Sequence, residues 1–114
     1  MTIIYNHHIE NDICVITVMG EIGEDLCRYI EECLTHYLKG VVINLKKLEK
    51  LNSSAFGMLM QVDKKLRSYQ VKLAICELSA GNARLFQNTL LGEIIDVYAI
   101  EGEAIKSVLN ATDP

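Results

Sequence analysis

The sequence predicts an α/β fold: a mixed, mostly parallel β-sheet with an antiparallel N-terminal edge strand and about four helices. Two apolar, β-branched runs at residues 3–9 and 13–19 are separated by the turn formers Glu10-Asn11-Asp12, which indicates a β-hairpin. Helix and strand patterns then alternate to the end of the chain, as they do when helices connect parallel strands. No repeat, linker or block of like charge divides the 114 residues, so we expect residues 1–114 to form a single domain.

The first two elements after the hairpin are expected to be a helix and a central strand. Apolar residues three and four apart predict a helix over residues 24–38, which Lys39-Gly40 ends. Its apolar face comprises Leu26, Tyr29, Ile30, Cys33, Leu34, Tyr37 and Leu38. The run 41–45 has no polar face, so we expect it at the centre of the sheet, covered by helices.

A second helix is predicted from residue 52 to residue 69. Its apolar side comprises Phe56, Leu59, Met60, Val62, Leu66 and Tyr69. The remaining elements are a strand at 71–76, a helix at 82–91, a strand at 93–99 and a helix at 103–110. The buried residues of the 82–91 helix are expected to be Leu85, Phe86 and Leu90.

The expected topology places one loop at the functional edge of the sheet. In open α/β sheets, ligands and partners usually bind at the carboxyl ends of the parallel strands. The loop that carries Asn52, Ser53 and Ser54 follows the strand at 41–45 and therefore lies at this edge.

Composition excludes several classes of function. The 11 Lys and Arg against 15 Asp and Glu give a formal charge of −4 without a basic stripe, which argues against nucleic-acid binding. No run approaches the roughly 18 apolar residues that cross a bilayer, and the N-terminus does not resemble a secretory signal, so we expect a cytoplasmic protein without membrane insertion. Neither phosphate-binding glycine motif is present, so neither a nucleotide enzyme nor a cofactor is expected.

The cysteines and histidines do not predict a metal site. The four cysteines lie far apart, without a C-x-x-C pair, and are expected to be reduced core thiols: Cys14, Cys27, Cys33 and Cys76. Cys27 and Cys33 are separated by about 240° around a helix and do not face each other. His7 and His8 are adjacent on a strand and point to opposite faces, whereas His36 is alone on a helix.

The segment from Leu51 to Gly57 has two interpretations. In the structural one, Asn52 or Ser53 caps the following helix, and the small residues let the helix pack closely. In the functional one, a serine at the helix N-terminus accepts a phosphate, because free amides and the positive end of the helix dipole favour negative charge there.

The order of these motifs resembles that of STAS domains, the anti-sigma-factor antagonists of bacterial regulatory switches. The segment 52–57 is similar to their Asp-Ser-Ser-Gly-Leu-Gly signature, and the strand 41–45 to their central strand, with Asn44 in an acidic position. Further similarities are Gly20-Glu21-Ile22, Arg84-Leu85-Phe86 followed by Thr89-Leu90-Leu91, and Glu103-Ala104-Ile105. The sequence departs from the family pattern at Gly23, Asn52, Ala55 and Leu90.

The resemblance implies a function in partner switching. Ser53 would be phosphorylated by a partner that is both kinase and anti-sigma factor, and a PP2C-like serine phosphatase would restore the unmodified form; the domain itself would not be an enzyme. The docking surface would include Asn52, Ser54, Phe56 and Met60. Two further residues are expected to join it from the local pattern: Met58, because it lies off the apolar stripe, and Ser79, because it opens a loop at the same edge.

Two other functions remain open. The chain is compatible with a STAS scaffold subunit that binds a partner protein without phosphorylation. It is also compatible with a small enzyme that uses a serine or a cysteine at the edge of the sheet.

Overall fold

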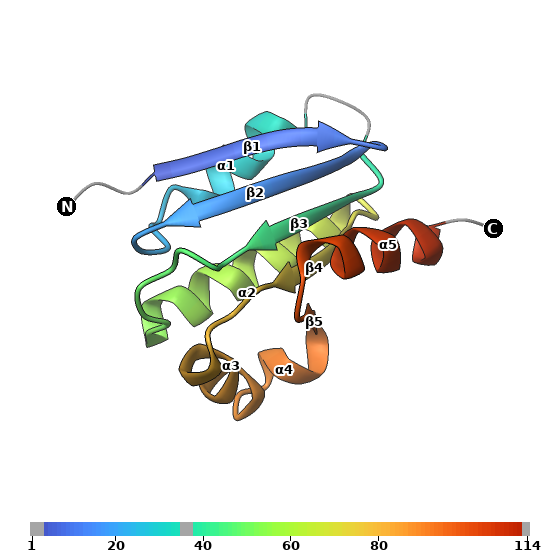
Figure 1. The fold of residues 1–114 in the computed structure, drawn as a ribbon. Coiled ribbons are helices and arrows are strands. Elements are labelled where there is room, and N and C mark those ends of the chain that lie inside the picture. The colour runs from blue at the N-terminus through green and yellow to red at the C-terminus, as the bar shows by residue number, and fades with distance from the viewer. Residues whose placement is uncertain (1–3, 35–37, 113–114) are drawn as a thin grey trace.

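A five-stranded sheet carries the fold of the protein, whose computed structural model describes residues 4–34 and 38–112 (Figure 1). The strands follow in spatial order: β1 (Ile4–Glu10), β2 (Ile13–Met19), β3 (Gly40–Asn44), β4 (Lys72–Cys76) and β5 (Asp96–Tyr98). β1 pairs antiparallel with β2, and the other pairs are parallel. The predicted mixed sheet, with its antiparallel N-terminal edge strand and its central strand at 41–45, is confirmed.

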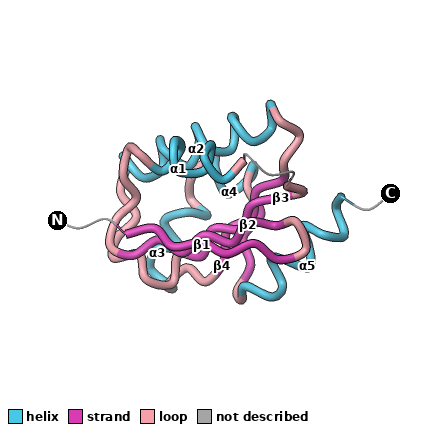
Figure 2. Tube along the Cα trace, turned by 90° about the horizontal axis from the view of Figure 1, so that it is seen from above, coloured by secondary structure: helices cyan, strands magenta, loops and turns pink. Residues whose placement is uncertain are grey.

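Helices cover both faces of this sheet. In chain order they are α1 (Leu26–Cys33), α2 (Ser53–Ser68), α3 (Ala80–Gln87), α4 (Leu91–Ile94) and α5 (Glu101–Thr112). α1 and α2 lie on one face, and α5 lies on the other (Figure 2). α3 and α4 lie beyond β5, at one end of the structure (Figure 1).

The side chains of β3 explain why this strand is apolar throughout. Val41 and Ile43 belong to the larger core under α1 and α2, whereas Val42 belongs to the smaller core under α5. Because successive side chains point to opposite faces, a strand covered on both sides has no polar face.

The hairpin between β1 and β2 depends on its turn residues. Asn11 and Asp12 have φ angles of 52° and 63° and form a two-residue connection. Asn and Asp tolerate this left-handed conformation better than most residues, and its twist matches that of the paired strands.

Two of the expected helices differ in length from the prediction. The helix expected over 24–38 extends from Leu26 to Cys33, and Tyr37 and His36 lie outside the described residues. The single helix expected over 82–91 is divided into α3 and α4, and the strand expected over 93–99 is only Asp96–Tyr98. The Thr89 hydroxyl donates to the Phe86 carbonyl oxygen at 2.7 Å, which stabilises the turn between the two helices.

This division changes which leucines are buried. Leu85 and Leu90 were expected in the core, but they are 44% and 62% exposed. Leu91, the first residue of α4, packs in the core beside Phe86 instead. The chain turns between Phe86 and Leu91, so the helical period that would have buried Leu90 does not continue across this turn.

The expected apolar side of α2 is wrong at two residues. Met60 is 45% exposed and Tyr69 is 56% exposed, whereas Met58 is half-buried against the core. At 100° per residue, Met60 lies about 130° from the centre of the buried stripe and Met58 only about 70°. Tyr69 follows the last helical residue, beyond the part of α2 that packs on the sheet.

Candidate functional site

The loop between β3 and α2 is attached to the end of β2. The backbone N–H of Gly20 donates to the Lys47 carbonyl at 3.1 Å, and the N–H of Glu49 donates to the Gly20 carbonyl at 2.8 Å. Gly20 has a φ of 88°, in the left-handed region that favours glycine. These two hydrogen bonds hold the first half of the loop against the end of β2.

The second half of the loop is attached to α3. The side chain of Asn82, which is only 5% exposed, accepts a hydrogen bond from the backbone N–H of Leu51 at 3.1 Å. The backbone N–H of Asn82 in turn donates to Oγ of Ser79 at 3.2 Å. Asn82 thus holds the chain just before α2 against the start of α3. Asn82 could not be predicted from the sequence, because its role depends on a contact with a residue 31 positions away.

These two attachments present the N-terminus of α2 to solvent. Asn52 caps the helix: its Oδ1 accepts from the Ala55 backbone N–H at 2.8 Å, and its carbonyl accepts from the Phe56 N–H at 3.1 Å. Ser53 and Ser54 follow as the first two helical residues, and both are exposed. Neither hydroxyl has a hydrogen-bond partner among the described residues. The Ser53 hydroxyl is therefore accessible to another protein.

The structure brings together most of the residues expected at the docking surface. Asn52, Ser53 and Ser54 are consecutive and exposed, and Ser79 is linked to them through Asn82. Phe56 is half-buried, with its ring centroid 6.3 Å from that of Phe86.

The two methionines of α2 differ in what they offer a partner. Met58, expected to be exposed, packs against the core, and Met60 is the methionine that faces solvent. Ser53 and Met60 are seven positions apart and therefore lie on nearly the same face of the helix. Met60 is thus the better candidate for contact with a partner that binds at Ser53.

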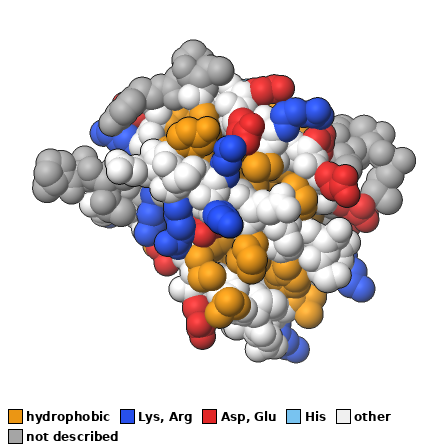
Figure 3. All heavy atoms as spheres, turned by 180° about the vertical axis from the view of Figure 1, so that it is seen from behind, with side chains coloured by type: hydrophobic (Ala, Val, Ile, Leu, Met, Phe, Trp, Pro, Cys, Tyr) orange, Lys and Arg blue, Asp and Glu red, His pale blue; other side chains and the backbone are white. Residues whose placement is uncertain are grey.

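An apolar surface continues from Met60 towards the end of the sheet. Figure 3 shows apolar side chains gathered over α3 and α4. The exposed apolar residues in this part of the chain are Leu85, Leu90, Ile94, Val97 and Ile100. A shallow groove between α2 and α4 has Met60 and Ile94 in its walls.

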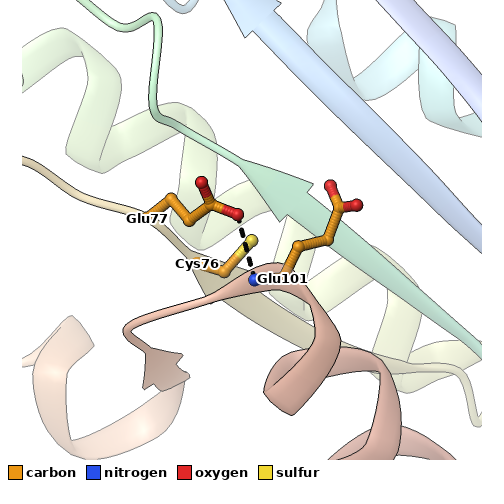
Figure 4. A group of neighbouring side chains, drawn as sticks. All are labelled: Cys76, Glu77 and Glu101. Carbon is orange, nitrogen blue, oxygen red and sulfur yellow. Dashed lines mark hydrogen bonds between the residues drawn. The ribbon is translucent and has the colours of Figure 1, made fainter.

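A polar cluster occupies the carboxyl ends of β3 and β4. Asn44, which is 8% exposed, donates through Nδ2 to Glu77 at 3.2 Å and to Glu101 at 3.0 Å. Its Oδ1 accepts from the Lys46 backbone N–H at 2.9 Å, at the start of the loop that leads to Ser53. The Glu101 N–H donates to the Glu77 carboxylate at 3.0 Å (Figure 4).

The sulfur of Cys76 lies between the two glutamate side chains of this cluster (Figure 4). Cys76 was expected in an apolar context, and it is fully buried, but its surroundings include two carboxylates. Burial and then the negative charges of Glu77 and Glu101 raise the pKa of the Cys76 thiol to about 12. The thiol is therefore protonated at neutral pH.

The other cysteines do not form a reactive site either. All four cysteines are free thiols, and burial is the main cause that raises the pKa of each. Because the thiolate is the nucleophile, a raised pKa disfavours a cysteine enzyme.

The two strand histidines are separated, as their alternation predicts. Nδ1 of His7 is hydrogen-bonded to the Tyr29 hydroxyl of α1. Nε2 of His8 lies 4.0 Å from the Glu10 carboxylate, and both residues of this pair are exposed.

The chain is similar to proteins of one family. The model of the STAS domain family matches residues 5–104. The anti-sigma-B factor antagonist of Listeria monocytogenes is 33% identical over 98 residues, which are 82% of this chain and 86% of that protein.

Solved structures of this class share the fold. An anti-sigma factor antagonist from Mycobacterium paratuberculosis superposes with a TM-score of 0.81 at 20% identity, and 95% of each chain is covered. The Bacillus cell fate determinant SpoIIAA, in its phosphorylated form, superposes with a TM-score of 0.65 at 20% identity, covering 92% of this chain and 99% of that one. In the described part of the chain, no helix combines the length and the apolar character needed to span a bilayer.

Proposed function

Since this chain belongs to the STAS domain family, we propose that it is an anti-sigma-factor antagonist that is switched by phosphorylation of Ser53. The unmodified domain binds a kinase-like anti-sigma factor and thereby releases the sigma factor. Phosphorylation of Ser53 by this partner ends the binding, and a PP2C-like phosphatase restores it. The domain acts in the cytoplasm by binding and does not catalyse a reaction itself.

The observation that carries this proposal is the accessibility of the Ser53 hydroxyl on a fixed backbone. Ser53 is exposed, and its hydroxyl has no hydrogen-bond partner among the described residues. The loop before it is held by Gly20 on one side and by Asn82 on the other. A kinase therefore meets the hydroxyl without having to unfold a helix.

The chemistry of the helix N-terminus supports a large effect of phosphorylation. A phosphate adds about −1.5 to −2 charges to a surface that otherwise presents a neutral cap. The positive end of the α2 dipole favours this charge, so the phosphorylated domain remains folded. A partner that packs against the neutral surface then meets an unfavourable charge.

The test uses the serine kinase and anti-sigma factor of the same organism with ATP. Mass spectrometry is expected to find one phosphate on the wild-type chain, none on Ser53→Ala and one on the matched Ser54→Ala variant. Ser53→Asp is expected to weaken binding of the anti-sigma factor about tenfold or more, as measured by isothermal titration calorimetry. Phosphorylation of Ser53→Ala at the wild-type stoichiometry would exclude this acceptor.

A second prediction concerns the exposed methionine of α2. We expect Met60→Glu to weaken partner binding about tenfold or more, because it places a charge on the apolar part of the docking surface. Gln61→Glu adds the same charge at the neighbouring exposed position and is expected to change affinity much less. The stability of both variants should be near that of the wild type. Equal affinities for the two variants would remove Met60 from the interface.

A constitutive scaffold is the second candidate function. The exposed apolar residues of α3, α4 and β5 favour it, because a large apolar surface marks a protein interface whether or not a serine is modified. A scaffold binds its partner equally well with Ser53→Asp and with the wild type. The Ser53→Asp affinity therefore distinguishes the two functions.

A further inference from the structure

Three potential metal ligands converge at the carboxyl end of β4: Sγ of Cys76 and carboxylate oxygens of Glu77 and Glu101. We propose that these side chains form a binding site for a divalent transition metal of the zinc class. The site is separate from Ser53 and does not depend on the proposed function.

The geometry of the three ligand atoms suits a small cation. Cys76 and Glu77 are consecutive at the end of β4, and Glu101 is the first residue of α5 (Figure 4). The three atoms lie within 4.8 Å of one another. Tetrahedral zinc with one sulfur and two oxygen ligands needs separations of about 3.5 Å. The two glutamate side chains are not fully buried, so they can rotate to supply this contraction of up to about 1.3 Å.

The thiol is the observation that distinguishes this cluster from a group of surface acids. Cys76 is 0% exposed, its sulfur lies between the two glutamates, and it has no hydrogen-bond partner among the described residues. A thiol is only a weak hydrogen-bond donor, and a metal–sulfur bond would give this sulfur a strong partner.

The negative charges around the thiol also favour the binding of a cation. Among the described residues, no Lys or Arg forms an ion pair with Glu77 or Glu101. The amide of Asn44 is the neutral donor that bridges the two carboxylates. In this negative surrounding a bound dication stabilises the thiolate and both carboxylates.

The chemistry of the ligands selects the class of metal. A thiolate with carboxylates suits Zn²⁺ or Co²⁺, whereas Mg²⁺ and Ca²⁺ prefer oxygen ligands alone. On binding, the Cys76 thiol releases its proton to solvent and the sulfur forms the bond to the metal; one water completes the tetrahedron. Asn44 donates to both carboxylates in this structure and would help to orient them.

Co²⁺ is the probe that identifies the thiolate ligand. We expect the reduced protein to bind one Co²⁺ per chain with a near-ultraviolet sulfur-to-cobalt charge-transfer absorption, which added Zn²⁺ removes. Zn²⁺ should also raise the Tm by a few degrees, whereas Mg²⁺ should not. Exposed histidines that bind cobalt would not produce the thiolate absorption.

Matched variants locate the site. Cys76→Ser should abolish the charge-transfer absorption, whereas Cys27→Ser, at a half-buried cysteine of α1, should leave it unchanged. The double variant Glu77→Gln and Glu101→Gln keeps the thiol and the fold, and it should weaken Co²⁺ binding about tenfold or more. The proposal is overturned if the wild type shows no thiolate absorption, or if this absorption persists in folded Cys76→Ser protein.

Discussion

Replacing Gly40 with alanine is expected to destabilise the domain by about 3 kcal/mol. A Cβ atom at Gly40 would lie 2.2 Å from Cγ1 of Val108 and 3.0 Å from the Lys72 carbonyl oxygen. Gly40 is the first residue of β3, and Val108 packs over it from α5. Neither the strand nor the short, branched valine side chain can move away without disturbing the core.

Urea unfolding of a double variant tests this explanation. Val108→Ala removes the clashing atom, so Gly40→Ala with Val108→Ala should be more stable than the sum of the two single effects predicts. Gly57→Ala is the matched control, because a Cβ at Gly57 meets no atom within 4 Å. Since Gly57 lies inside α2 and alanine has the higher helix propensity, the free energy of unfolding of this control should rise by up to about 1 kcal/mol. Equal stability of Gly40→Ala and Gly57→Ala would contradict the close contact.

Asn44→Asp is the second change with a large expected effect. We expect it to lower the free energy of unfolding by about 3 kcal/mol at neutral pH, measured in the presence of a metal chelator. The substitution removes the N–H donors that bridge Glu77 and Glu101. It also places a third carboxylate against these two, in a position that is only 8% exposed in the wild type. The loss therefore combines unmade hydrogen bonds with repulsion of like charges.

Two variants separate these contributions. Asn44→Ala removes the donors without adding charge and should have an intermediate stability. Asn52→Asp makes the same chemical change at the exposed cap of α2, where Oδ1 still accepts from the Ala55 N–H. The added charge at the helix N-terminus should stabilise this control by about 0.3–1 kcal/mol. Thermal unfolding with equal losses for Asn44→Asp and Asn52→Asp would exclude a specific role of the cluster.

The two glutamates give a physical account of the neutral residue at position 44. The resemblance placed Asn44 where an acidic residue is typical, and the structure shows two glutamates beside it. A neutral donor is compatible with these neighbours, whereas a carboxylate is not. At Asn52 the amide performs the same capping as an aspartate would, so no comparable constraint is visible there.

The parts of the fold that depend on local pattern were predictable from the sequence. The hairpin follows from Asn11 and Asp12 between two apolar runs, and the central strand follows from a run without a polar face. The exposed position of Ser53 follows from the loop after this strand. In each case the information lies within about ten neighbouring residues.

The parts that depend on contacts between distant residues were not predictable. The division between α3 and α4 depends on a turn that periodicity does not reveal, and the roles of Met58 and Met60 depend on the rotation of α2 against the sheet. The position of Asn82 beside Leu51 and that of Glu77 beside Glu101 depend on the packing of separate elements.

The attachment of the β3–α2 loop to Gly20 and Asn82 has a consequence for signalling. Both attachments use backbone groups and the side chain of Asn82, and neither uses the Ser53 hydroxyl, so the proposed esterification of Ser53 would not remove them. In the proposed switch, the two forms would then share this loop conformation and differ in the charge at the N-terminus of α2. The partner would distinguish them by local electrostatics at the point of contact, and the other surfaces of the domain would stay available in both forms.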